Sequence, residues 1–165
     1  MLFAFVATGA TLVPAAGALA CEAVGPPTAD SVARHARAVR CELNQERAMH
    51  GLSAVRHDNG LARAARRFSR AMVDHGFFDH VSPGGSTLGS RLKRAGFRAA
   101  GRAGETIGWG SGSQASPASI VSAWMASPPH RAIILDGGFS EVGVGVAPGA
   151  PVGGAGATVT ADFAG

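Results

Sequence analysis

Two stretches near the end of the chain alternate between apolar residues and polar or glycine residues, and this pattern most constrains the fold. Residues 139–147 read FSEVGVGVA and residues 158–163 read TVTADF, with a glycine-rich loop between them. A period of two predicts half-buried β-strands, and a short loop between two such strands predicts an antiparallel hairpin. The apolar side of this hairpin must then be covered by other parts of the chain.

The segments before the hairpin have the helical period instead. Apolar residues recur every three or four positions and stop at glycine or proline, which predicts helices over residues 30–51, 58–76, 87–95 and 116–127. Residues 105–109 are predicted as a short strand. The order of helices and strands indicates an α+β domain, in which helices cover an antiparallel sheet.

Length and charge narrow the class of protein. The chain has 165 residues, 46% hydrophobic and 16% charged, which fits one folded domain and excludes charge-driven disorder. The net charge is +4, but the arginines are scattered, with no basic run and no interleaved aromatic residues. We therefore expect no nucleic-acid partner, because such proteins concentrate their positive charge.

The first 20 residues, MLFAFVATGATLVPAAGALA, carry no charge and end in a small-x-small pattern. This pattern predicts a signal peptide over residues 1–20, incomplete because it lacks the usual positive start. The alternative is an N-terminal membrane anchor, since about 20 apolar residues can span a bilayer. Residues 21–30 are a linker by composition, and residues 31–165 form the predicted domain.

Two cysteines, Cys21 and Cys41, are present in the chain. In an exported protein they predict one disulfide, which would attach the N-terminal segment to the first helix. Two free thiols, or a lipid on Cys21, remain alternatives. Neither cysteine has a histidine beside it, so nothing points to a catalytic thiol.

The sequence lacks the zinc-protease motif HExxH and the hydrolase motif GxSxG. Four histidines fit solvated positions on or near predicted helices: His35, His50, His57 and His75. By contrast, His80 and His130 each follow a predicted helix, between turn residues and apolar anchors. Glu105 lies in an apolar, glycine-rich stretch and needs a partner if it is buried. These three side chains could hold a metal ion, or Glu105 could be satisfied by the backbone and one histidine.

Several motifs occur in a recognisable order: LNQER at 43–47, FDH at 78–80, GETI at 104–107, WMASPPHR at 124–131 and FSEVGVG at 139–145. Together they resemble the bacterial CAP domain of the cysteine-rich secretory protein, antigen 5 and pathogenesis-related superfamily. The resemblance covers about residues 38–164. It implies a three-layer α-β-α sandwich with a central antiparallel sheet.

The same resemblance implies a cleft with two histidines and two glutamates. His80, Glu105 and His130 take three of these places, and Ser127 stands where many members have the second glutamate. The cleft residues are thus His80, Glu105 and His130, with Ser127 as a lesser contributor. A divalent cation such as zinc is the cofactor that this set suggests. Pro129 replaces a family glycine and removes a backbone donor beside His130.

Three functions are compatible with these features. We expect a secreted or surface-associated, monomeric binding module without catalysis, whose cleft takes a divalent cation or small ligand. Its partner would be a small molecule, a lipid or a cell-wall component. The alternative is a secreted metal-dependent hydrolase acting on peptide or cell-wall substrates. The third is a structural protein in which the cleft has lost its role.

Overall fold

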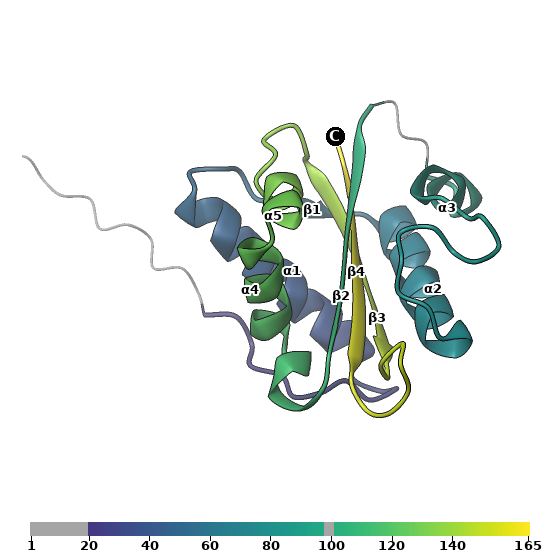
Figure 1. Ribbon diagram of the computed structural model, residues 1–165. Helices are drawn as coiled ribbons and strands as arrows, with labels where there is room; N and C mark the ends of the chain where they lie inside the picture. Colours follow the sequence, from purple (N-terminus) through teal and green to yellow (C-terminus); the bar gives the residue numbers. More distant parts are fainter. Residues whose placement is uncertain (1–19, 98–100) are drawn as a thin grey trace, which may run out of the picture.

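The computed structural model describes residues 20–97 and 101–165. In this part of the chain one sheet lies between two helical layers (Figure 1). One layer contains α1 (Val32–Met49), α4 (Pro117–Ala126) and α5 (Pro128–Ile134), and the other contains α2 (Asn59–His75) and α3 (Leu88–Arg94). The α+β three-layer sandwich expected from the sequence is confirmed.

The sheet has the strand order β1-β3-β4-β2. Its strands are β1 (Arg56–His57), β2 (Ala103–Gly110), β3 (Glu141–Pro148) and β4 (Ala157–Ala164). The predicted hairpin is β3 and β4, and β2 pairs antiparallel with β4. The sheet is mixed rather than wholly antiparallel, because β1 pairs parallel with β3. Two residues are too few to show a strand period, so β1 left no signal in the sequence.

Three helices begin directly after a residue whose side chain caps the helix. The side chains of Asp58, Thr87 and Ser116 accept hydrogen bonds from the backbone N–H groups three residues later, at the starts of α2, α3 and α4. The sequence analysis did not predict α5, in which Pro128 and Pro129 occupy the first turn. Proline is tolerated there because a first-turn N–H has no partner within the helix.

The two faces of β3 differ in side-chain size, which sets how close the helices come. Its valines, Val142, Val144 and Val146, belong to the main core, together with residues of α1, α4 and α5. On the opposite face, a Cβ at Gly143 or Gly145 would overlap the backbone of α2 at Ala62 or Arg66. Helix α2 therefore packs backbone to backbone on this glycine stripe.

The LNQER motif connects α1 to distant loops. Asn44 hydrogen-bonds both backbone groups of Val55, its amide donating to the carbonyl and its oxygen accepting from the N–H. Arg47 is buried and donates to the carbonyls of Ser53, Ile134, Asp136 and Phe139. One guanidinium thus satisfies the carbonyls at the end of α5 and in the following turn, where no helical partner exists.

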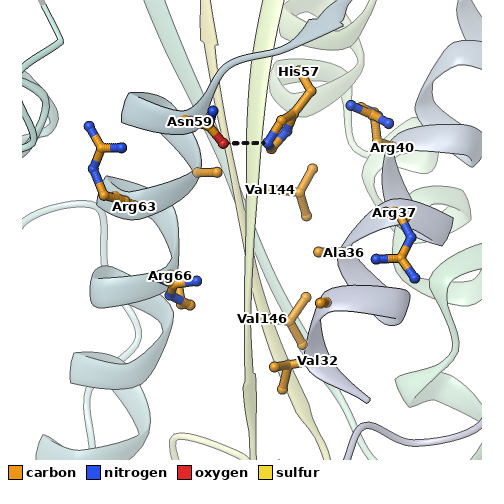
Figure 2. A pocket seen from close by; sticks show the side chains of 12 residues that line it. Val32, Ala36, Arg37, Arg40, His57, Asn59, Arg63, Arg66, Val144 and Val146 are labelled. Carbon is orange, nitrogen blue, oxygen red and sulfur yellow. Dashed lines mark hydrogen bonds between the residues drawn. The ribbon is translucent and has the colours of Figure 1, made fainter. Parts of the chain in front are cut away.

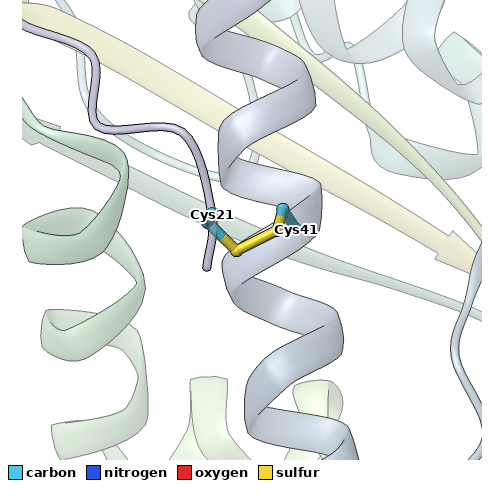
Figure 3. The surroundings of a disulfide bond; sticks show 2 residues. All are labelled: Cys21 and Cys41. Atoms are coloured by element: carbon cyan, nitrogen blue, oxygen red, sulfur yellow. A yellow bond between two sulfur atoms is a disulfide. The ribbon is translucent and has the colours of Figure 1, made fainter. Parts of the chain in front are cut away.

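The N-terminal segment is attached to α1 by the predicted disulfide between Cys21 and Cys41, whose Cα atoms lie 5.7 Å apart (Figure 3). The predicted signal peptide falls almost wholly on residues 1–19, outside the described residues. None of the helices in residues 20–97 and 101–165 has the length and apolarity needed to span a membrane. His35, expected in solvent, is instead buried, and burial lowers the pKa of its imidazole.

The glycine stripe gives a test of the packing. The substitution Gly143→Ala should reduce the free energy of unfolding by at least about 2 kcal/mol, because a methyl group there forces α2 away from the sheet. Urea unfolding measures this loss. The control is Gly89→Ala in α3, where the added Cβ meets nothing within 4 Å. An equally stable Gly143→Ala protein would contradict the close contact between α2 and β3.

Candidate functional site

Three separate elements bring the candidate cleft residues together. His80 lies in the loop between α2 and α3, Glu105 lies on β2, and His130 lies in the first turn of α5. The Nδ1 atom of His80 is 2.8 Å from Oε1 of Glu105. The ring centroids of His80 and His130 are 6.3 Å apart. Glu105 and His130, which are 25 and 50 positions after His80 in the sequence, therefore lie close to it in the fold.

Small residues on β2 allow the helices on its other face to approach. A Cβ at Gly104 would stand 3.0 Å from the Phe139 ring and 3.1 Å from Ile133 of α5. A Cβ at Gly108 would stand 2.8 Å from the indole nitrogen of Trp124. That nitrogen donates to the carbonyl of Ile107 at 2.8 Å. The GETIG segment is glycine-rich because α4 and α5 pack directly against its backbone.

Glu105 is buried, with 5% of its surface exposed, and its second oxygen bonds to Arg91. The Nη2 of Arg91 lies 2.5 Å from Oε2 of Glu105. Its Nη1 donates to the carbonyls of His80 and Ser86, and its guanidinium lies 3.4 Å above the ring of Phe68. Arg91 therefore neutralises Glu105 and also fixes the loop that carries His80.

A second buried carboxyl group lies beside this ion pair. Asp162 of β4 is the cross-strand neighbour of Glu105, and it has no exposed surface. Among the described residues no donor bonds to either of its oxygens, but in its protonated form Asp162 can donate a hydrogen bond to Glu105. Burial raises the pKa of Asp162 well above its ordinary value, and the negative charge of Glu105 raises it further. Burial thus favours the neutral form of Asp162, while Glu105 makes the interaction with Arg91.

The two cleft histidines have opposite pKa shifts. The hydrogen bond to Glu105 raises the pKa of His80, although partial burial opposes it. Burial lowers the pKa of His130, and the positive charge of His80 lowers it further. His130 is therefore the more readily deprotonated imidazole, and His80 the more readily charged one.

The cleft offers two imidazoles but no free carboxylate. Both oxygens of Glu105 are engaged, one by His80 and one by Arg91. Within residues 20–97 and 101–165, no three His, Cys, Asp or Glu side chains are arranged to hold a metal ion. Ser127 lies half-buried between α4 and α5, and within the same residues no hydrogen bond joins its hydroxyl to His130. Pro129 lies in the first turn of α5, so its missing N–H costs the helix no internal hydrogen bond.

Two residues of this site were not predicted. Arg91 lies in a helix that the sequence predicted, and its neighbours gave no sign that its side chain points inward. Asp162 occupies a polar position in the alternating TVTADF segment, where solvent exposure is the usual expectation. That polar side of β4 is buried beneath α2, and Thr158 and Thr160 on it are buried too.

Comparison with known proteins shows the family to which this fold belongs. Residues 42–163 match the model of the CAP, or cysteine-rich secretory protein, family. The chain belongs to this family. Among curated relatives, its CAP domain is similar to the protein YkwD of Bacillus subtilis, with 36% identity over 115 residues. That match covers 70% of this chain and 43% of YkwD.

Solved structures share the fold of this CAP domain. An extracellular protein containing an SCP domain from Bacillus anthracis has a TM-score of 0.72 and 28% identity, covering 86% of this chain and 45% of that one. An outer surface protein of Borrelia burgdorferi has a TM-score of 0.69 over 87% of this chain and 98% of its own, and at 15% identity it shows the fold alone. The chain thus spans less than half the length of YkwD and of the Bacillus anthracis protein.

The opposite pKa shifts can be measured directly by NMR titration of the imidazoles. His80 should titrate above the ordinary value of 6.5 and His130 below it. The variant Glu105→Gln should lower the pKa of His80, because it removes the carboxylate that stabilises the imidazolium. The stabilisation from His80 is complete below its unfolded-state pKa and disappears as pH rises through the higher folded-state pKa. A His80 pKa that Glu105→Gln leaves unchanged would contradict the pairing.

The ion pair can be tested through stability. Arg91→Met should lower the free energy of unfolding by about 3 kcal/mol, because it leaves the buried Glu105 without its cation. The control is Arg94→Met on the same helix, whose exposed guanidinium donates to the Ser86 hydroxyl and whose loss should cost less than about 1 kcal/mol. Urea unfolding measures both losses. If the two variants lose the same free energy of unfolding, the buried ion pair stabilises the fold no more than the exposed contact of Arg94 does.

Proposed function

We propose that the protein is a secreted or surface-associated binding module, and that its cleft takes a divalent cation or a small polar ligand through His80 and His130. The observation that supports this is the double engagement of Glu105 by Arg91 and His80. A carboxylate in that position is not free to act as a general base. It is well placed to orient the imidazole of His80, whose Nε2 then faces away from Glu105.

The two imidazoles supply one ligand fewer than the three protein ligands of common open zinc sites, so water or the bound ligand would fill the other positions. Imidazole nitrogen is a preferred zinc ligand, and a ligating histidine commonly donates its other N–H to a carboxylate. His80 and Glu105 have this relation. His130 is neutral at neutral pH because burial lowers its pKa, so it can ligate without first losing a proton. When bound, zinc would act as a Lewis acid, with Glu105 and Arg91 keeping His80 in place.

The location and partner of the module are part of the same proposal. The disulfide suits an oxidising compartment outside the cytoplasm, and a similar protein of Bacillus anthracis is an extracellular one. A signal peptide over residues 1–20 would account for export, and an anchor formed by that segment is the alternative. We expect a monomer that binds a small molecule, lipid or cell-wall component and does not bind nucleic acid.

A secreted hydrolase is the second candidate, and the opposite pKa shifts of His80 and His130 favour it. Two titratable groups whose environments separate their pKa values can serve as an acid and a base. Release of amines from a peptide, or of reducing ends from cell-wall material, would identify this activity. It should then disappear in His130→Ala. Absence of any such release from either substrate supports the binding module.

Calorimetric titration with zinc tests the proposed site. At slightly alkaline pH the full chain should bind one zinc ion, and His80→Ala and His130→Ala should each weaken binding by at least about tenfold. Affinity should fall as pH drops through the pKa of His80, because a proton then competes with the metal.

The matched control is His57→Ala, whose exposed imidazole contacts Asn59 at the other edge of the sheet. It should bind zinc as the parent protein does. Equal affinity in all three variants would reject the cleft as the metal site. Absence of zinc binding by the parent protein would reject the cation and leave only the small polar ligand.

A further inference from the structure

A second concave site lies on the side of the molecule away from β2. A groove of about 380 Å³ runs between α1 and α2, and the valines Val144 and Val146 of β3 lie in it (Figure 2). Strand β1 pairs only with Glu141 and Val142 at one end of β3. Beyond that point the chain turns into α2, so the rest of this edge of β3 is left between the two helices.

The backbone of β3 is unpaired along this groove. The N–H of Asp58 donates to the carbonyl of Val142, so the backbone of Val142 faces the β1 edge. Because backbone groups alternate in direction along a strand, those of Val144 and Val146 face the same edge. In the described part of the chain no strand pairs with them on that side. Such a row of N–H and C=O groups can accept another strand.

Both walls of the groove carry positive charge. Helix α1 contributes Arg37 and Arg40, and α2 contributes Arg63 and Arg66 (Figure 2). The guanidinium of Arg63 donates to the carbonyl of Ala95. Among residues 20–97 and 101–165, the other three have neither an ion pair nor a hydrogen bond, and no acidic residue lines the groove. The planar guanidinium of arginine can donate two parallel hydrogen bonds to one carboxylate, so these side chains favour an acidic ligand.

We propose that this groove binds an extended acidic peptide segment of a partner protein, added as a strand to the free edge of β3. Two features of the groove favour a peptide ligand over a simple anion. The edge presents carbonyls as well as N–H groups, and only a ligand with both donors and acceptors satisfies them. The walls present arginines on both sides of that edge, so glutamate or aspartate side chains on either face of an added strand meet a cation.

The site is independent of the histidine cleft. β3 and β4 lie side by side in the sheet, and β4 separates β3 from β2, which carries Glu105. Peptide binding at the β3 edge therefore does not depend on zinc, and loss of one activity leaves the other measurable.

The probe is a fluorescent, end-blocked hexapeptide of alternating glutamate and valine, added to the full chain and followed by anisotropy. It should bind, whereas the same peptide with lysine for glutamate should not. A version N-methylated at every residue should lose binding, because it has no N–H group on either side to donate to the strand edge. Amide exchange at Val144 and Val146 should slow in the complex, which a purely electrostatic contact would not cause.

Charge-reversal variants locate the peptide. Arg37→Glu and Arg66→Glu should each weaken binding by about tenfold. Arg70→Glu is the control, because Arg70 lies on α2 outside the groove and pairs with Asp74. It should change binding by less than about twofold. Unchanged thermal unfolding of the three variants confirms that they fold.

Two results would overturn the proposal. If the N-methylated peptide binds as well as the parent peptide and pyrophosphate displaces both, the groove is an anion patch without strand addition. If neither glutamate peptide binds, the arginines only protect an exposed strand edge from aggregation.

Discussion

The ion pair between Arg91 and Glu105 is the interaction on which the cleft depends. Both side chains are almost fully buried, so each charge needs the other. Arg91 comes from α3 and Glu105 from β2, so their contact ties a short helix to the sheet. The same guanidinium also binds the backbone of the loop that carries His80. Glu105 in turn binds the His80 imidazole, and this chain of contacts sets the position of one cleft histidine. Burial and the negative charge of Glu105 favour the neutral form of Asp162 beside the pair, because Glu105 already uses the nearby cation.

The other histidine is positioned by packing. His130 belongs to α5, which reaches β2 because Gly104 leaves room for Ile133 and Phe139. Arg47 of α1 then binds the carbonyls that follow the end of α5. On this side the missing Cβ of Gly104 and the buried guanidinium of Arg47 position the helix. The cleft therefore combines an electrostatic constraint on His80 with a steric constraint on His130.

Local signals in the sequence were enough for most of the fold. Capping side chains such as Asp58 and Ser116 marked helix starts, and strict alternation marked β3 and β4. The disulfide was predicted from two cysteines in a chain expected to be exported, and the structure confirms it over two free thiols. Strand β1 was too short to have a period, and Pro128 and Pro129 indicated a helix end although they begin α5.

His80, Glu105 and His130 were found through a family resemblance. Arg91 and Asp162 were missed because burial of a charged residue depends on distant partners, which local patterns do not encode. His35 was missed for a related reason, since its burial also arises only in the folded chain.

The two proposals concern different parts of the sheet, the histidine pair beside β2 and the arginine-lined edge of β3. The central claim is that Glu105 orients His80 while the two imidazoles bind the ligand. Anomalous diffraction from crystals of the protein soaked in zinc tests it most directly. One peak is expected within bonding distance of His80 Nε2 and a ring nitrogen of His130, with Glu105 still bonded to Arg91. A zinc ion bound by the Glu105 carboxylate after it has left Arg91, or no peak beside the two histidines, would show that the imidazoles do not form the metal site.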